Sequence, residues 1–178
     1  MSTDALDVQM LSSGLLVARI VIGLLMAAHG AQKLFGWFGG YGLSKTGEFF
    51  VQLGFRQGRT FAAAASVGEI VSGLLVVLGF LGPVGPALMI SVMVVAAISV
   101  HWEHGLFAAN NGVEVPLLYG AAALSLALGG PGSYSLDAWL GLAGRWNNTA
   151  IAVVLALGII GGFANLALRR RATTAPGA

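Results

Sequence analysis

The chain has 178 residues, of which 57% are hydrophobic and only 9% are charged, and its formal net charge is +2. Soluble domains usually carry about 25% charged residues, and a chain this short cannot bury so much apolar surface in a water-facing fold. The composition and the mean hydropathy of +0.85 therefore exclude an ordinary soluble domain and predict an all-α, polytopic membrane protein.

Other classes of protein are excluded by what the sequence lacks. Cysteine is absent, which removes disulfides, thiolate catalysis and cysteine-based metal clusters. Basic residues are few and form no folded basic face, so we expect no nucleic-acid binding. The first ten residues contain Asp4 and Asp7 but no basic residue, whereas a secretory signal needs positive charge there. We expect the first apolar segment to remain in the protein.

Five segments are apolar enough to serve as membrane-spanning helices, each of which needs about 20 residues. They run over residues 11–34, 61–81, 87–100, from Pro116 to the GGPG stretch, and 150–168. Pro86 and Pro116 each fit the first turn of a helix, where proline is tolerated. The sequence LGPVGP predicts a tight turn after the second span.

The connection SKTGEFFVQLGF is expected to form a short helix at the membrane interface, with Ser44 or Thr46 as its N-cap. Aromatic residues favour the membrane interface. Phe49 and Phe50 lie in this connection, and Trp37, Phe38 and Tyr41 lie just before it.

A second short helix is expected in YSLDAWLGLAGRW. Ser135 fits its N-cap, and Trp139 and Trp146 are expected at the interface.

Lysine and arginine in short loops predict the orientation of the spans, because these residues are retained on the cytoplasmic side. With five spans, the side of the N-terminus carries Arg145. The other side carries Lys45, Arg56, Arg59 and the block Arg169, Arg170 and Arg171. We therefore expect the N-terminus outside and the C-terminus in the cytoplasm.

Three basic residues of the first span share one stripe of the helix. Arg19 and Lys33 fall within about 40° of each other, and His29 lies about 80° to one side. Both long side chains could instead extend along the helix toward a membrane surface.

Glu69 lies inside the second span, where a carboxylate must be protonated, paired or in contact with water. Because consecutive spans are antiparallel, Glu69 is expected at the depth of His29. We predict that Glu69 meets His29 or Lys33, with Arg19 within reach. The alternative is an ion pair that only holds two helices together.

The third span ends in SVHWEHGLFAANNGVEVP, which contains His101, Glu103, His104 and Glu114. His101 and His104 share one helix face and, with a carboxylate, are weak candidates for a zinc or iron site. The alternative is a hydrated helix end followed by a turn at NNG.

Topology brings one set of polar residues to the same end of the helix bundle: His29, Lys33, Glu69, His101 and Glu114. We expect a polar pocket there, covered by the aromatic residues of segment 35–50. Such a pocket suits a quinone headgroup, whose carbonyls need donors such as His or Lys. It also suits a small substrate or a purely structural network.

The order of several motifs resembles the DoxX family of small bacterial integral membrane proteins, over about residues 15–140. The motifs are Arg19, HGAQK, GEIVSG around Glu69, His101, GVEVPLL and GPGSYSLD. The sequence shows no internal repeat or low-complexity segment, so a single membrane domain is expected over residues 1–178. The resemblance implies that its core is a four-helix bundle. The additional span over about residues 150–168 departs from the shortest members of the family.

The resemblance also implies a place in the bacterial plasma (inner) membrane and a redox-linked role. The family includes a subunit of a thiosulfate:quinone oxidoreductase and a mycobacterial protein of an oxidative-stress complex. One hypothesis is therefore a quinone-linked oxidoreductase subunit that works with a soluble or membrane-bound oxidoreductase partner. In it, the residues that bind the quinone and relay protons are Arg19, His29, Lys33, Glu69, His101 and Glu114. The alternative is a non-catalytic scaffold or small-solute carrier. The sequence leaves catalysis, substrate and homo-oligomerisation open.

Overall fold

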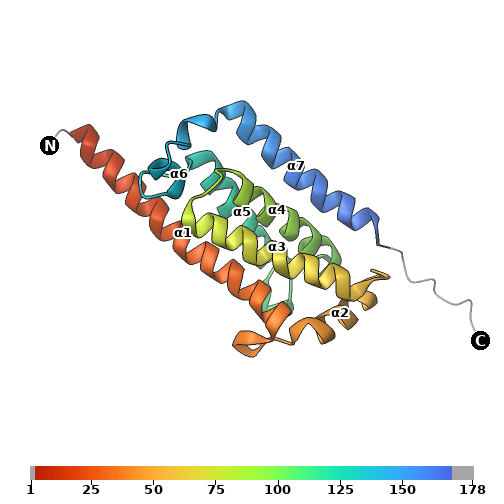
Figure 1. The fold of residues 1–178 in the computed structure, drawn as a ribbon. Helices are drawn as coiled ribbons and strands as arrows, with labels where there is room; N and C mark the ends of the chain where they lie inside the picture. Colours follow the sequence, from red (N-terminus) through yellow and green to blue (C-terminus); the bar gives the residue numbers. More distant parts are fainter. Residues whose placement is uncertain (1–2, 170–178) are drawn as a thin grey trace, which may run out of the picture.

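The computed structural model describes residues 3–169, so Arg170 and Arg171 of the predicted basic block lie outside the described residues. The described chain is built from helices and their connections (Figure 1). The α-helices are α1 (Thr3–Phe35), α2 (Gly42–Gln52), α3 (Gly58–Leu78), α4 (Val84–Ala96), α5 (Glu114–Gly129), α6 (Leu136–Trp139) and α7 (Asn148–Ala167). A π turn over Ala97–His101 continues α4, and 3-10 turns cover Trp37–Gly39, Trp102–His104, Ala108–Asn110 and Ala143–Arg145.

Within residues 3–169, four helical segments are long and apolar enough to cross a membrane: Leu6–Phe35, Gly58–Leu78, Val84–His104 and Asn148–Ala167. The remaining apolar helix, α5, has 16 residues and is therefore only about 24 Å long. The predicted all-α membrane fold is confirmed, with short helices in the loops and an additional C-terminal helix. The fourth predicted span is shorter than the other four.

Local signals explain several helix ends. Pro86 and Pro116 each occupy the third position of their helix, in the first turn as predicted. Gly79 adopts a left-handed conformation with φ of 60° and ends α3 three residues before the predicted boundary at Leu81.

The two predicted helix caps have different outcomes. Ser135 caps α6 as predicted, because its Oγ accepts from the Ala138 N–H at 3.1 Å. The prediction of Ser44 or Thr46 as the cap of α2 is wrong. That helix already begins at Gly42, and the Thr46 hydroxyl donates back to the Gly42 carbonyl at 2.8 Å within the helix.

Small residues let the long helices approach closely. On α1, Gly30 lies against the Ser66 backbone of α3, and a Cβ at Gly30 would come within 2.5 Å of the Ser66 carbonyl oxygen. On α7, Gly158 and Gly162 lie in the same way against α4. Figure 1 shows both pairs, α1 beside α3 and α7 beside α4. Small residues serve the same purpose in other membrane helix pairs.

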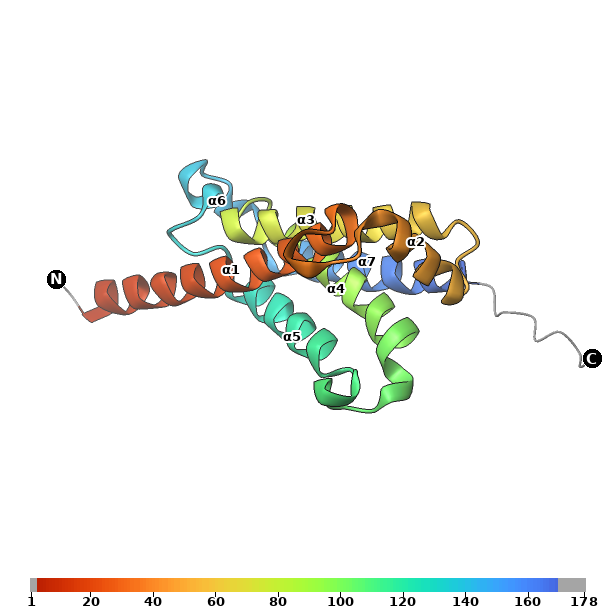
Figure 2. The same cartoon turned by 90° about the horizontal axis from the view of Figure 1, so that it is seen from below.

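The helices are not all parallel. In Figure 2, α1, α3 and α7 run along one direction, while α4 and α5 slope away and meet at the connection formed by residues 97–113. Between the helices lies a core that includes Met26, Val76, Met89, Tyr119 and Ala123. The polar residues of interest lie around this core.

Candidate functional site

Lys33 of α1 and Glu69 of α3 form an ion pair, in which the Lys33 ammonium donates to Glu69 Oε1. The Glu69 side chain is 1% exposed, whereas that of Lys33 is 34% exposed. Among the described residues, the second carboxylate oxygen, Oε2, has no hydrogen-bond partner although it is buried. The predicted contact between Glu69 and Lys33 is therefore present, and it leaves one acceptor free.

Lys33 also lines a cavity of about 310 Å³ between α2, α3, α4 with its π turn, and α7. Most of its wall is apolar. The polar side chains on the wall are Lys33, Thr46, Ser91, Ser99, His101 and Asn165. A mostly apolar cavity with a few polar groups is the usual form of a small-molecule site, and this volume lies at the lower end of the usual range.

Five of the aromatic residues of segment 35–50 divide between two places, and Tyr41 is exposed and lines neither. Phe49 and Phe50 of α2 line the cavity, as predicted for a cover. Phe35, Trp37 and Phe38 do not. They line a separate outer groove of about 740 Å³ along α1.

His29 does not pair with Glu69. It is exposed, it lines the outer groove, and its ring lies edge-on to Tyr119 of α5 with ring centroids 5.8 Å apart. His29 thus lies against Tyr119 rather than against the Lys33–Glu69 pair.

Arg19 is not part of this cluster, and the prediction that it reaches Glu69 is wrong. It lies 14 residues before Lys33, about 21 Å away along the helix. Its side chain is 3% exposed, so it does not extend to a membrane surface. The guanidinium donates to the Pro131 carbonyl at 2.7 Å and to the Tyr134 carbonyl, and Nε is buried with no partner among the described residues.

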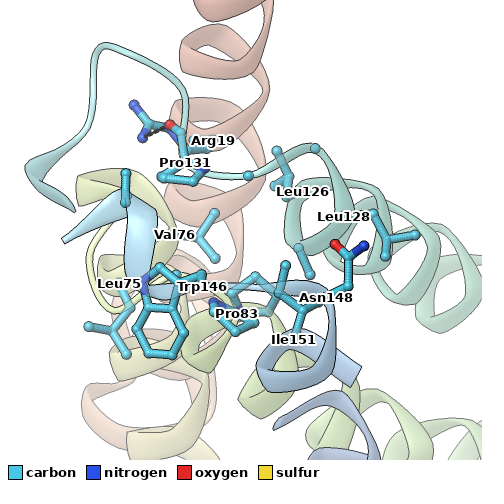
Figure 3. Close-up of a pocket in the computed structure, with 17 residues that line it drawn as sticks. Arg19, Leu75, Val76, Pro83, Leu126, Leu128, Pro131, Trp146, Asn148 and Ile151 are labelled. Carbon is cyan, nitrogen blue, oxygen red and sulfur yellow. Dashed lines mark hydrogen bonds between the residues drawn. The ribbon is translucent and has the colours of Figure 1, made fainter. Parts of the chain in front are cut away.

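Figure 3 shows Arg19 beside Pro131 at one edge of a second pocket, of about 210 Å³, with the Trp146 indole on its wall. This pocket lies where α5 ends and α4 and α7 begin. The Arg19 contacts tie α1 to the loop that follows α5.

Asp137 is the last residue of the motif GPGSYSLD, to which no role was assigned from the sequence, and it is fully buried at the start of α6. Its carboxylate accepts from the backbone N–H groups of Leu81 and Gly82 at 2.9 and 2.7 Å, and from the Trp146 indole N–H at 2.9 Å. The Trp146 indole is therefore held by Asp137. The available signal was an acidic residue in the otherwise uncharged stretch GPGSYSLDAW.

The residues around the end of α4 do not gather as a metal site. His101 Nδ1 lies 2.7 Å from the Asn111 carbonyl oxygen, and His104 Nδ1 lies 3.0 Å from that of Val100. Glu103 is exposed. Within residues 3–169, no group of three or more His, Asp or Glu side chains is arranged to hold a metal ion.

Glu114 is the first residue of α5 and is not on the cavity wall. Its Oε2 accepts from the Ala108 N–H at 2.7 Å. Of the five residues expected to converge, Lys33 and Glu69 pair, Lys33 and His101 share the cavity, and His29 and Glu114 lie outside it.

Comparison with protein families gives one match, to the DoxX model over residues 14–102, which is half of the chain. The matched part contains Arg19, the HGAQK stretch, Glu69 and His101, and it ends before Glu114 and Asp137. Neither a search of curated proteins nor a search of solved structures gives a match. With this match and its apolar helices, the chain is a multi-pass membrane protein that belongs to the DoxX family.

Proposed function

We propose that this protein is a quinone-interacting, redox-linked subunit of an oxidoreductase or oxidative-stress complex in the bacterial inner membrane. One observation carries the proposal: Lys33, paired with the buried Glu69, lines a mostly apolar cavity. A quinone has a flat apolar ring with carbonyl oxygens that only accept hydrogen bonds, and such a cavity offers both an apolar wall and a donor.

The donors at the cavity match this ligand. The Lys33 ammonium has three N–H donors and gives one to Glu69 Oε1, so two remain for a carbonyl oxygen. The ring would lie against Phe49, Phe50 and Phe61, and the apolar tail would leave between the helices. Glu69 holds Lys33 in place through the ion pair.

A bound quinone would supply electron and proton transfer between the membrane and an oxidoreductase partner. In this account Lys33 binds and orients the headgroup and Glu69 holds Lys33. Arg19 takes no part, because its guanidinium is engaged about 21 Å away along α1.

The alternative, a non-catalytic scaffold or solute carrier, is favoured by a different observation. The ion pair joins the same two helices that glycines bring into close contact, α1 and α3. In that case the pair only fixes the two helices, and the cavity holds lipid.

The test is to extract the protein directly into native-lipid discs and to identify bound quinone by mass spectrometry. We expect quinone in the wild type and its loss in Lys33→Met and Glu69→Gln, with folding checked by circular dichroism. His29→Ala is the matched control, because His29 is a titratable residue of the same helix outside the cavity. A folded wild type without quinone, or equal quinone in all variants, would contradict the proposal.

A further inference from the structure

His101 is held in one tautomer by the loop that follows it. Its Nδ1 lies 2.7 Å from the backbone carbonyl oxygen of Asn111. A carbonyl oxygen only accepts hydrogen bonds, so Nδ1 must carry the proton. In the neutral ring the other nitrogen, Nε2, is then an acceptor.

The loop that presents this carbonyl is well fixed. Asn111 is in the left-handed region with φ of 62°, which asparagine tolerates better than most residues. The backbone N–H groups of Gly112 and Val113 donate to the carbonyls of Phe107 and Gly105, each at 3.0 Å.

Glu114 closes the same loop from its other end. Its backbone N–H donates to the Leu106 carbonyl at 2.8 Å, and its carboxylate accepts from the Ala108 N–H at 2.7 Å. Glu114 therefore acts as a positioning residue for the carbonyl that fixes His101.

His101 also faces the cavity. The π turn Ala97–His101 places Ser99, Val100 and His101 on the cavity wall, and π turns often occur at functional sites. Because Nδ1 is bound to the loop, Nε2 is the ring nitrogen left for a ligand. The cavity thus offers a donor at Lys33 and, in the neutral imidazole, an acceptor at His101 Nε2.

We propose that His101 makes this cavity selective for the reduced, hydroxyl-bearing quinol over the oxidised quinone. The inference rests on the proposed function. A quinol oxygen can accept from Lys33 while a quinol O–H donates to His101 Nε2, whereas a quinone has only acceptor oxygens and leaves Nε2 unpaired. One net hydrogen bond corresponds to about a fivefold to tenfold preference.

Binding of a short-tailed benzoquinol and of its benzoquinone, measured separately under anaerobic conditions, tests the selectivity. His101→Asn keeps a donor at the position of Nδ1 for the Asn111 carbonyl and removes Nε2. We expect the ratio of the two dissociation constants to be about fivefold to tenfold in the wild type and near one in His101→Asn. The matched control is His104→Asn, because His104 is bound in the same way to Val100 but lies outside the cavity.

A spectroscopic readout separates the tautomer from ligand binding. In protein labelled with ¹⁵N-histidine, the His101 ring is expected to show a protonated Nδ1 in the wild type and in Glu114→Gln. It is expected to show mixed tautomers in Glu114→Ala. Two results would overturn the selectivity alone. One is a neutral His101 ring with its proton on Nε2 in the wild type, and the other is the same ratio of quinone to quinol dissociation constants in the wild type and in His101→Asn. Failure to bind either compound, with Nδ1 protonated, would overturn the proposed function and the selectivity with it.

Discussion

Glu69 and Asp137 are both buried carboxylates, but different numbers of donors surround them. Asp137 accepts three hydrogen bonds, all from the turn after α3 and from Trp146. Glu69 accepts one, from Lys33, and keeps a free oxygen. A buried carboxylate with its donors in place stabilises the fold, whereas the unpartnered oxygen of Glu69 is a buried acceptor left unsatisfied among the described residues.

Asp137→Asn should destabilise the protein. In asparagine an NH₂ group, which cannot accept a hydrogen bond, replaces one of the two carboxylate oxygens. At least one of the N–H groups that donate to Asp137 therefore loses its acceptor, at a cost of about 2 kcal/mol. Asp7→Asn is the control, since Asp7 is exposed and a surface change should stay within about 0.5 kcal/mol. Chemical unfolding in detergent micelles measures both, and equal stability of the two variants would argue against a structural role for Asp137.

The two sides of the Lys33–Glu69 pair should respond unequally to mutation. Lys33→Met leaves a buried carboxylate without its partner, which should cost about 3 kcal/mol, whereas in Glu69→Gln the half-exposed ammonium can turn toward water. The double variant should recover part of the loss. A double-mutant cycle of unfolding free energies checks this, and strictly additive effects would mean that the pair is not coupled.

The association of α1 with α3 depends on where glycines lie along α1. Hydropathy in the sequence predicted both helices, because a membrane span is set by length and composition. It did not predict which glycines meet a neighbour, since this depends on how each helix is rotated and tilted. Gly14 and Gly30 lie in the same helix, yet a Cβ at Gly14 would have nothing within 4 Å.

The same substitution at these two glycines should therefore have opposite effects. Gly30→Ala forces a Cβ against the Ser66 backbone and should destabilise by about 1 to 3 kcal/mol. Gly14→Ala should be neutral or stabilise by up to about 1 kcal/mol, because alanine loses less entropy in a helix. Thermal unfolding of both variants in one detergent gives the comparison. A stabilising effect at Gly30 would contradict the close contact.

The assembled molecule places the two ends of its described chain at opposite ends of the helix bundle (Figures 1 and 2). A chain that crosses a membrane an odd number of times has its two ends on opposite sides. The four long helices and α5 make five crossings, provided that the short α5 also spans the membrane. At about 24 Å it is shorter than a typical hydrocarbon core of about 30 Å, so the bilayer must thin beside it or polar residues at its ends must reach the surface.

We expect a tag at the N-terminus to be accessible from outside the cell and a tag at the C-terminus only from the cytoplasm. The reason is the excess of Lys and Arg on the side of Lys45, Arg56 and Arg59. Accessibility labelling of intact and opened cells measures both positions. Two tags on the same side would show that one of the five helices does not cross.

Elements could be predicted from the sequence better than contacts. The apolar helices, the short helix α2 and the Lys33–Glu69 contact follow from hydropathy and from helix depth. Arg19 and His29 could not be placed, because depth alone does not tell which neighbour a side chain faces. Asp137 and Asn111 depend on loop conformations, and no periodic pattern in the sequence encodes those.

The central claim is that the cavity beside Lys33 holds a quinone headgroup, and photolabelling tests it most directly. A short-tailed photoreactive quinone should label peptides of α2 and of segment 91–101, and an excess of unlabelled quinone should suppress the labelling. Lys33→Met should lose this labelling while remaining folded. Labelling confined to the outer groove around His29 and Trp37, or no labelling above that of a photoreactive lipid, would contradict the account.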